Sequence, residues 1–284
     1  MSHISSLSIG LERGIATPGR TLISSERHSQ RVFIGVSALL FVVSATVTVL
    51  WCGSMSAMPG MSMPGGWTMS MAWMRMPGQT WIAAGGTFVA MWVLMMAAMM
   101  LPSLSPMLWR YRRALEWRGQ PRLGLLTAIA GVAYFFVWAL CGVAVFLVGA
   151  GIASPAMQWP ALARTAPMAA GVVVLAAGTV QFTNWKARHL AGCREEPIRG
   201  AVLPASVGNA WRHGLRFGRH CGLSCANLTV ILLVAGAMDL RTMALVTVAI
   251  TAERIAPGGA RIARAIGAGA ICAGLLVIAG LVRL

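Results

Sequence analysis

Two cysteines, Cys221 and Cys225, stand four residues apart where a basic stretch runs into an apolar one. On a helix this spacing places both thiols on the same face. His220 directly precedes the first cysteine, and several arginines lie upstream. Thiolate and imidazole are ligands for Cu(I) and Zn(II), and nearby positive charge favours the thiolate form. The pattern predicts a metal site at the mouth of a helix; a buried structural cysteine pair is the alternative.

A second pair with the same spacing, His189 and Cys193, lies in the preceding basic stretch. Glu253 is the third candidate, and Arg254 follows it directly. Its carboxylate would serve as a hard ligand or as an acceptor for a ligand imidazole. The alternative for Glu253 is an ion pair at a helix end, which contributes little to stability.

Eight methionines crowd the stretch 53–81, which is otherwise rich in Gly, Pro and Ser. They are Met55, Met58, Met61, Met63, Met69, Met71, Met74 and Met76. A thioether is a soft, uncharged ligand that suits Cu(I) and needs no deprotonation. The stretch therefore predicts a copper-gathering loop; an adaptable apolar surface on lipid or on a partner is the alternative.

Five of the six methionines in the apolar segment 82–108 lie close together. Met91, Met95 and Met99 share one helical stripe, and Met96 and Met100 share the adjacent stripe. Methionine also fills helix interfaces, so core packing is as good an interpretation as a metal path.

The composition indicates the elements that must position these residues. Of the 284 residues, 57% are hydrophobic and 11% are charged, with a mean hydropathy of +0.73. Soluble domains carry about 25% charged residues. We therefore expect an all-α, polytopic transmembrane helical bundle in contact with the lipid bilayer. The net charge of +16 then reflects loop residues that set orientation, and we expect no nucleic-acid partner.

Apolar runs predict about seven spans, or six if the short segment 242–256 does not cross. We expect a disordered cytoplasmic tail at 1–31 and a helical membrane domain at 32–284. Within this domain we expect a Met-rich periplasmic loop at 53–81 and a basic cytoplasmic loop at 185–220. The expected spans are 32–52, 82–108, 123–150, 168–184, 221–238, 242–256 and 265–282.

The distribution of basic residues predicts the orientation. With a cytoplasmic N-terminus, 19 of the 23 Lys and Arg residues fall on the inner side, as the positive-inside rule requires. We expect a multi-pass protein of the bacterial inner membrane. The inner ends of four spans then bring Met99 and Met100, the His189 and Cys193 pair, the Cys221 and Cys225 pair, and Glu253 to one side.

No catalytic motif stands out. The chain lacks a phosphate-binding loop, a Gly-x-Ser-x-Gly elbow and a His-Glu-x-x-His pair. We expect a protein that is not an enzyme.

Four stretches together resemble the DUF2182 family, which is described as predicted metal-binding integral membrane proteins, some labelled copper chaperones. They are the run from Met91 to Pro102, the run QFTNWKARHLAGCREEP, the run from Gly214 to Leu228 and the run from Gly236 to Glu253. The resemblance covers roughly residues 82–257 and implies a metal-binding membrane bundle.

The chain departs from the family pattern at three positions. His189 stands where the family tends to have the first cysteine of a Lys-x-x-Cys-Leu-x-x-Cys run, whereas Lys186, Leu190 and Cys193 match. In the fifth span, Ser224 and Thr229 replace a third cysteine and a methionine. With these departures, the site that the resemblance implies would hold less sulfur than in the family pattern, and His189 would substitute as a ligand.

From these observations we expect an inner-membrane protein that handles Cu(I), as a chaperone or by transfer through Met and Cys/His ligands, with Zn(II) as the weaker alternative. A cuproenzyme or a periplasmic copper carrier would be its partner. The rival interpretation is a structural or assembly membrane protein that binds a partner and no metal.

Overall fold

The computed structural model describes residues 18–56, 60–64, 66–69, 73, 75, 78–117, 119–194 and 206–280. The described residues divide into two compact units, one up to Leu39 and one from Leu40 onward. The boundary between the two units lies inside the first helix. The candidate site residues that the structure describes all belong to the second unit.

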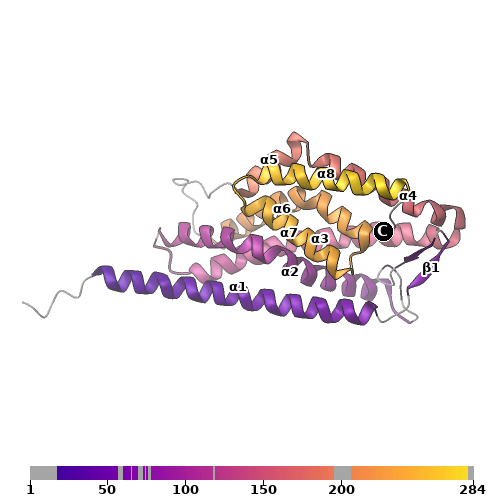
Figure 1. The fold of residues 1–284 in the computed structure, drawn as a ribbon. Coiled ribbons are helices and arrows are strands. Elements are labelled where there is room, and N and C mark those ends of the chain that lie inside the picture. The colour runs from indigo at the N-terminus through magenta and orange to yellow at the C-terminus, as the bar shows by residue number, and fades with distance from the viewer. Residues whose placement is uncertain are drawn as a thin grey trace, which may run out of the picture. The chain divides into compact units, whose positions relative to one another are not determined.

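Helices dominate the structure and confirm the all-α prediction (Figure 1). A short antiparallel hairpin, in which Met61 pairs with Met69, lies between the first two helices. The elements are α1 (Pro18–Ser56), β1 (Met61–Met63), β2 (Trp67–Met69), α2 (Trp81–Glu116), α3 (Leu123–Gln158), α4 (Pro160–Val180), α5 (Asn184–Arg194), α6 (Val207–Gly236), α7 (Leu240–Ile255) and α8 (Gly259–Ile278).

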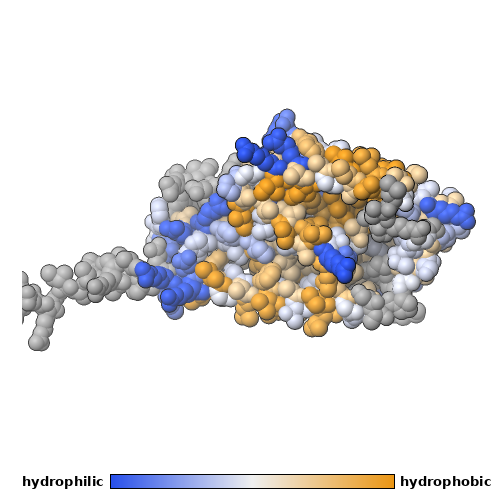
Figure 2. Space-filling model, viewed as in Figure 1, coloured by the Kyte–Doolittle hydropathy of each residue, from blue (hydrophilic) through white to orange (hydrophobic). Residues whose placement is uncertain are grey.

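Six of the described helices, α1, α2, α3, α4, α6 and α8, are long and apolar enough to cross a membrane. Large apolar side chains such as Val132, Leu147 and Leu275 are exposed on them, and Figure 2 shows hydrophobic residues gathered over the helices of the visible face. A surface of this kind suits lipid. The chain is a multi-pass membrane protein, and the short α7 is not among the six.

Several segments differ from the expected boundaries. Helices α2 and α3 continue past the expected ends at 108 and 150, and α4 begins at Pro160 instead of 168. The expected loop at 185–220 is helical in α5 and again from Val207, where Ser206 caps α6 by accepting a hydrogen bond from the Asn209 amide. Cys221 therefore lies near the middle of α6 and not at its mouth. The expected disordered tail is helical from Pro18, and residues 1–17 lie outside the described part. Polar and basic composition concealed these helical segments, because such residues at a helix end resemble a loop in hydropathy.

Small residues bring the helices close enough to form the site. A Cβ atom on Gly214 would collide with the carbonyl oxygen of Ala130, and one on Gly218 would lie 3.0 Å from the carbonyl oxygen of Tyr134. This close contact packs α6 against α3, as small residues commonly do between membrane helices. It places the next turn of α6, which carries Cys221, directly beside Tyr134.

Candidate metal centre

The two cysteines of α6 lie deep in the core of the bundle. Cys221 is 0% exposed and Cys225 is 2% exposed. They belong to the same hydrophobic core as Tyr134 of α3, whose hydroxyl lies 2.7 Å from the Cys221 sulfur. The prediction that both thiols share one face of a helix is confirmed.

The guanidinium of Arg254, near the end of α7, spans both thiols. Its Nη2 donates to the Sγ of Cys221 at 2.6 Å and to the Sγ of Cys225 at 2.8 Å. Its Nη1 donates to the hydroxyl of Ser103 on α2 at 3.0 Å. A buried charge needs partners of opposite charge or strong acceptors, so Arg254 favours the thiolate form at this pair.

The separation of the two sulfurs suits a shared metal ion. Because one nitrogen contacts both, the Sγ atoms of Cys221 and Cys225 lie no more than about 5.4 Å apart. Two metal–thiolate bonds of about 2.3 Å span up to about 4.6 Å. A small adjustment of rotamers would therefore let both thiolates bind one Cu(I) ion, which accepts few, soft ligands.

A third thiol approaches through Ser224. The hydroxyl of Ser224 lies 3.5 Å from the Sγ of Cys193 on α5 and 3.8 Å from the Sγ of Cys225. Burial raises the pKa of the Cys193 thiol, and the charge of Arg254 opposes the rise. Ser224 thus stands between two of the three thiols.

Glu253 takes part in a separate polar network one side chain away from the thiols. Its carboxylate forms a buried ion pair with Lys186 at 2.7 Å and accepts a hydrogen bond from Gln181 at 2.8 Å. Lys186 also donates to the backbone carbonyl of Ser224. Glu253 therefore forms an ion pair, which was the second interpretation of its sequence position. The pair is buried and not at a surface.

The two candidate histidines lie beside each other. The ring centroids of His189 and His220 are 5.7 Å apart, and a Cβ atom on Gly192 would lie 2.9 Å from the Nδ1 of His220. The absence of a side chain on Gly192 therefore lets α5 approach α6. Among the described residues, however, no three His, Cys, Asp or Glu side chains are arranged to hold one metal ion.

Five of the six methionines of α2 line the interior of the bundle. These five are buried and belong to the core that also contains the three thiols. They are Met91, Met95, Met96, Met99 and Met100. The two stripes expected from the sequence thus place thioethers in the core that surrounds Cys221 and Cys225. This position is compatible with both interpretations of the methionines, core packing and metal transfer.

The methionines between α1 and α2 have different surroundings. Met63 and Met69 pack into a small apolar cluster with alanines of α3 and α4, whereas Met61 is exposed and Met55 is half-buried. Met58, Met71, Met74 and Met76 lie outside the described residues. Met63 and Met69 therefore have the contacts of packing residues.

Three central residues, Lys186, Arg254 and Tyr134, were not predicted from the sequence. The basic residues assigned to cytoplasmic loops include Lys186 and Arg254, but these two are only 1% and 6% exposed. A signal for Lys186 was present, since it matches the Lys of the family run, and Arg254 follows the only acid of its apolar segment. Tyr134 had no signal, because nothing in an apolar helix marks which side chain faces a thiol.

Comparison with known proteins supplies the family. A family model described as PpoB2, copper chaperone, matches residues 89–277, which is about two thirds of the chain. No curated protein and no solved structure matches. The matched range includes the methionine stripes of α2, the cysteines of α5 and α6, and Arg254. The chain belongs to the PpoB2 copper chaperone family.

Proposed function

We propose that this membrane protein holds Cu(I) between the thiolates of Cys221 and Cys225 and passes it to a partner protein. The observation that supports the proposal is the contact of Arg254 with both sulfurs, at 2.6 and 2.8 Å. A Cu(I) ion with two thiolates has a net charge of −1. The guanidinium neutralises that charge inside an apolar bundle, where an unpaired charge is very costly.

Neighbouring residues would take up the ion beyond the thiol pair, since no three His, Cys, Asp or Glu side chains of the described residues are arranged to hold it together. Cys193 offers a third thiol across Ser224, and His189 with His220 flanks it at the junction of α5 and α6. The Met stripes of α2 offer thioethers that hold Cu(I) without a change of charge. Copper is the cargo in this scheme, which contains no catalytic step. Sulfur ligands favour Cu(I), and Zn(II) would compete only at the thiols.

The proposed setting is the bacterial inner membrane with a cytoplasmic N-terminus. The positive-inside bias of the loops supports this orientation. The Met-rich segment between α1 and α2, in which Met61 is exposed and Met55 is half-buried, then gathers copper on the periplasmic side. A periplasmic carrier or a cuproenzyme would be the partner.

A Cu(I) competition titration of the purified protein in detergent tests the proposal. The protein competes with a chromogenic Cu(I) chelator under anaerobic conditions, as wild type and as the double variant Cys221→Ser/Cys225→Ser. We expect the double variant to lose one equivalent of tightly bound Cu(I). The matched control is Cys272→Ser, which removes an exposed thiol of α8 and should leave binding unchanged.

Equal binding by wild type and the double variant would contradict the proposal. If neither binds Cu(I), the chain is a structural or assembly protein whose sulfurs serve packing. A circular dichroism spectrum and a monodisperse elution profile show that the double variant keeps its fold. Serine is the substitution of choice, since it retains a small polar side chain beside Arg254.

A further inference from the structure

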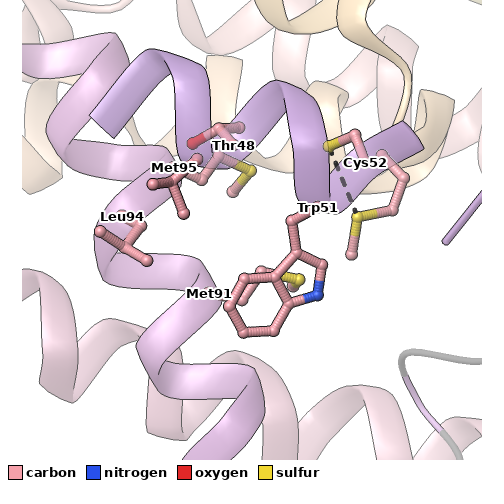
Figure 3. A pocket seen from close by; sticks show the side chains of 8 residues that line it. Thr48, Trp51, Cys52, Met91, Leu94 and Met95 are labelled. Carbon is pink, nitrogen blue, oxygen red and sulfur yellow. Dashed lines mark hydrogen bonds between the residues drawn. The ribbon is translucent and has the colours of Figure 1, made fainter. Parts of the chain in front are cut away.

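A second group of sulfur atoms lines a small cavity away from Cys221 and Cys225. Its walls come from α1, from α2 and from the turn between α6 and α7 (Figure 3). Four of the eight lining residues carry sulfur: Cys52, Met91, Met95 and Met238. The Sγ of Cys52 donates to the Sδ of Met238 at 4.0 Å, so helices distant in sequence converge on one sulfur cluster.

The chemistry of the cavity selects a soft monovalent ion. The other lining residues are Val47, Thr48, Trp51 and Leu94, so no carboxylate, imidazole or cationic group faces it. The one hydroxyl, that of Thr48, donates to the backbone carbonyl of Ser44 at 2.7 Å. Hard ions such as Mg²⁺ and Ca²⁺ need several oxygen ligands, and the side chains that line the cavity offer one hydroxyl, whereas thiol and thioether sulfur bind Cu(I).

The size of the cavity and the net charge of the bound complex also favour Cu(I). The cavity has room for about one atom of the size of a water molecule. Cu(I) bound to one thiolate and up to three thioethers is electrically neutral, so it needs no counter-ion in an apolar wall. The two-thiolate pair of α6 differs in this respect, because it has Arg254 as its counter-charge.

We propose that Cys52, Met91, Met95 and Met238 form a second Cu(I) site, separate from the thiol pair of α6. On binding, the thiol of Cys52 loses its proton to solvent and a Cu–S bond replaces the S–H bond, with no change in oxidation state. The three thioethers complete the coordination through lone pairs.

The position of the site gives it a role as a donor to the thiol pair. Met95 lines the cavity, and the stripes of α2 continue from it as Met96, Met99 and Met100 within the core that contains Cys221. Cys52 lies one helical turn before Ser56, the last residue of α1, so the cavity is close to the start of the Met-rich segment. Copper gathered there reaches the cavity first and the thiol pair afterwards.

The test separates the two sites by substitution. In a Cys193→Ser/Cys221→Ser/Cys225→Ser background, Cu(I) alone is titrated against a chromogenic chelator. We expect this variant to retain a Cu(I) site that weakens by about tenfold or more on adding Cys52→Ser or Met238→Leu. Even outer partners of a metal ligand change affinity 10- to 100-fold. Leucine conserves the volume of methionine, and Met168→Leu, on the exposed face of α4, is the matched control.

The reverse arm uses the native thiol pair. Cys52→Ser/Met238→Leu in the otherwise wild-type chain should lower the Cu(I) stoichiometry by one and leave the α6 site occupied. Unchanged stoichiometry and affinity in this arm would overturn the second site while the α6 site stands. Loss of copper only in this arm, with no effect of Cys221→Ser/Cys225→Ser, would support the cavity and overturn the proposed function. Because the reverse arm keeps Cys193, Cys221 and Cys225, the test survives misfolding of the triple variant.

Discussion

Arg254 donates from one nitrogen to the sulfurs of Cys221 at 2.6 Å and of Cys225 at 2.8 Å. The guanidinium and both thiols are buried, and a buried cation is stabilised by anionic partners. We therefore expect a site that holds Cu(I) between the thiolates of Cys221 and Cys225 to need Arg254 as well as the sulfurs.

Replacement of Arg254 should weaken Cu(I) binding. Arg254→Leu leaves the anionic Cu(I) complex without a counter-charge, so we expect at least about a tenfold loss of affinity in a chelator competition. Arg254→Lys keeps the charge but not the planar fork that also contacts Ser103. The Cu(I) affinity of this variant should therefore fall between those of wild type and Arg254→Leu. Binding by Arg254→Leu as tight as that of wild type would show that the guanidinium does not stabilise the complex.

The buried pair of Lys186 and Glu253 makes a second prediction. Either Lys186→Met or Glu253→Gln leaves an uncompensated buried charge and should destabilise the protein by about 3–5 kcal/mol. The double variant should recover most of that loss, because no charge remains unpaired. Thermal unfolding in detergent measures the cycle, with Arg264→Met on an exposed position as the control for loss of a cation. Additive losses in the double variant would show that the two side chains act independently.

The sequence predicted the helical class, the membrane location and the shared face of the α6 thiols, since hydropathy and helical spacing are local properties. It failed at Lys186 and Arg254, because a count of charges cannot distinguish a loop cation from a buried one. The partners of these two residues, Glu253 and the thiols, come from other helices. Such contacts depend on packing and leave no local pattern.

The predicted helix boundaries were wrong for a similar reason. Basic residues within the first turns of α6 lower its hydropathy, so the helix seemed to begin at Cys221 instead of Val207. The cavity of Cys52 and Met238 was also beyond sequence reasoning, because these residues are 186 positions apart.

Close packing of α6 against α3 yields a third prediction. Gly214→Ala places a methyl group against the carbonyl of Ala130, and we expect overpacking to cost about 1–3 kcal/mol. Gly222→Ala is the matched control on the same helix, since its Cβ meets no atom within 4 Å. Gly222→Ala should stabilise the protein by up to about 1 kcal/mol, because alanine has a higher helix propensity than glycine. Apparent Tm values of both variants in detergent measure the difference; equal shifts would contradict the close contact.

Asp239 caps α7 and makes a pH-dependent prediction. Its carboxylate accepts hydrogen bonds from the hydroxyl and the amide of Thr242 and from the amide of Arg241, and these bonds hold the pKa of Asp239 below its usual value. Because the native pKa is lowered, the stabilisation is present above pH of about 3.9, the unperturbed value. It is lost as pH falls through the native pKa.

Two variants check this cap. Asp239→Ala should destabilise by about 1 kcal/mol at neutral pH, whereas Asp239→Asn, which also caps helices, should lose less. Thermal unfolding at neutral pH and at about pH 3 measures the effect, and the deficit of Asp239→Ala should shrink at the lower pH. A deficit that is the same at both values would assign the loss to something other than the carboxylate.

Copper X-ray absorption on the purified protein tests the central claim most directly. A Cys52→Ser/Met238→Leu variant loaded with one equivalent of Cu(I) isolates the α6 site from the cavity. We predict Cu(I) with sulfur neighbours at about 2.3 Å, the length of a metal–thiolate bond, and a clear loss of thiolate signal in the same variant with Cys221→Ser/Cys225→Ser. Copper surrounded by nitrogen or oxygen alone, or a copper spectrum that does not change when both cysteines are replaced, would contradict the proposed site.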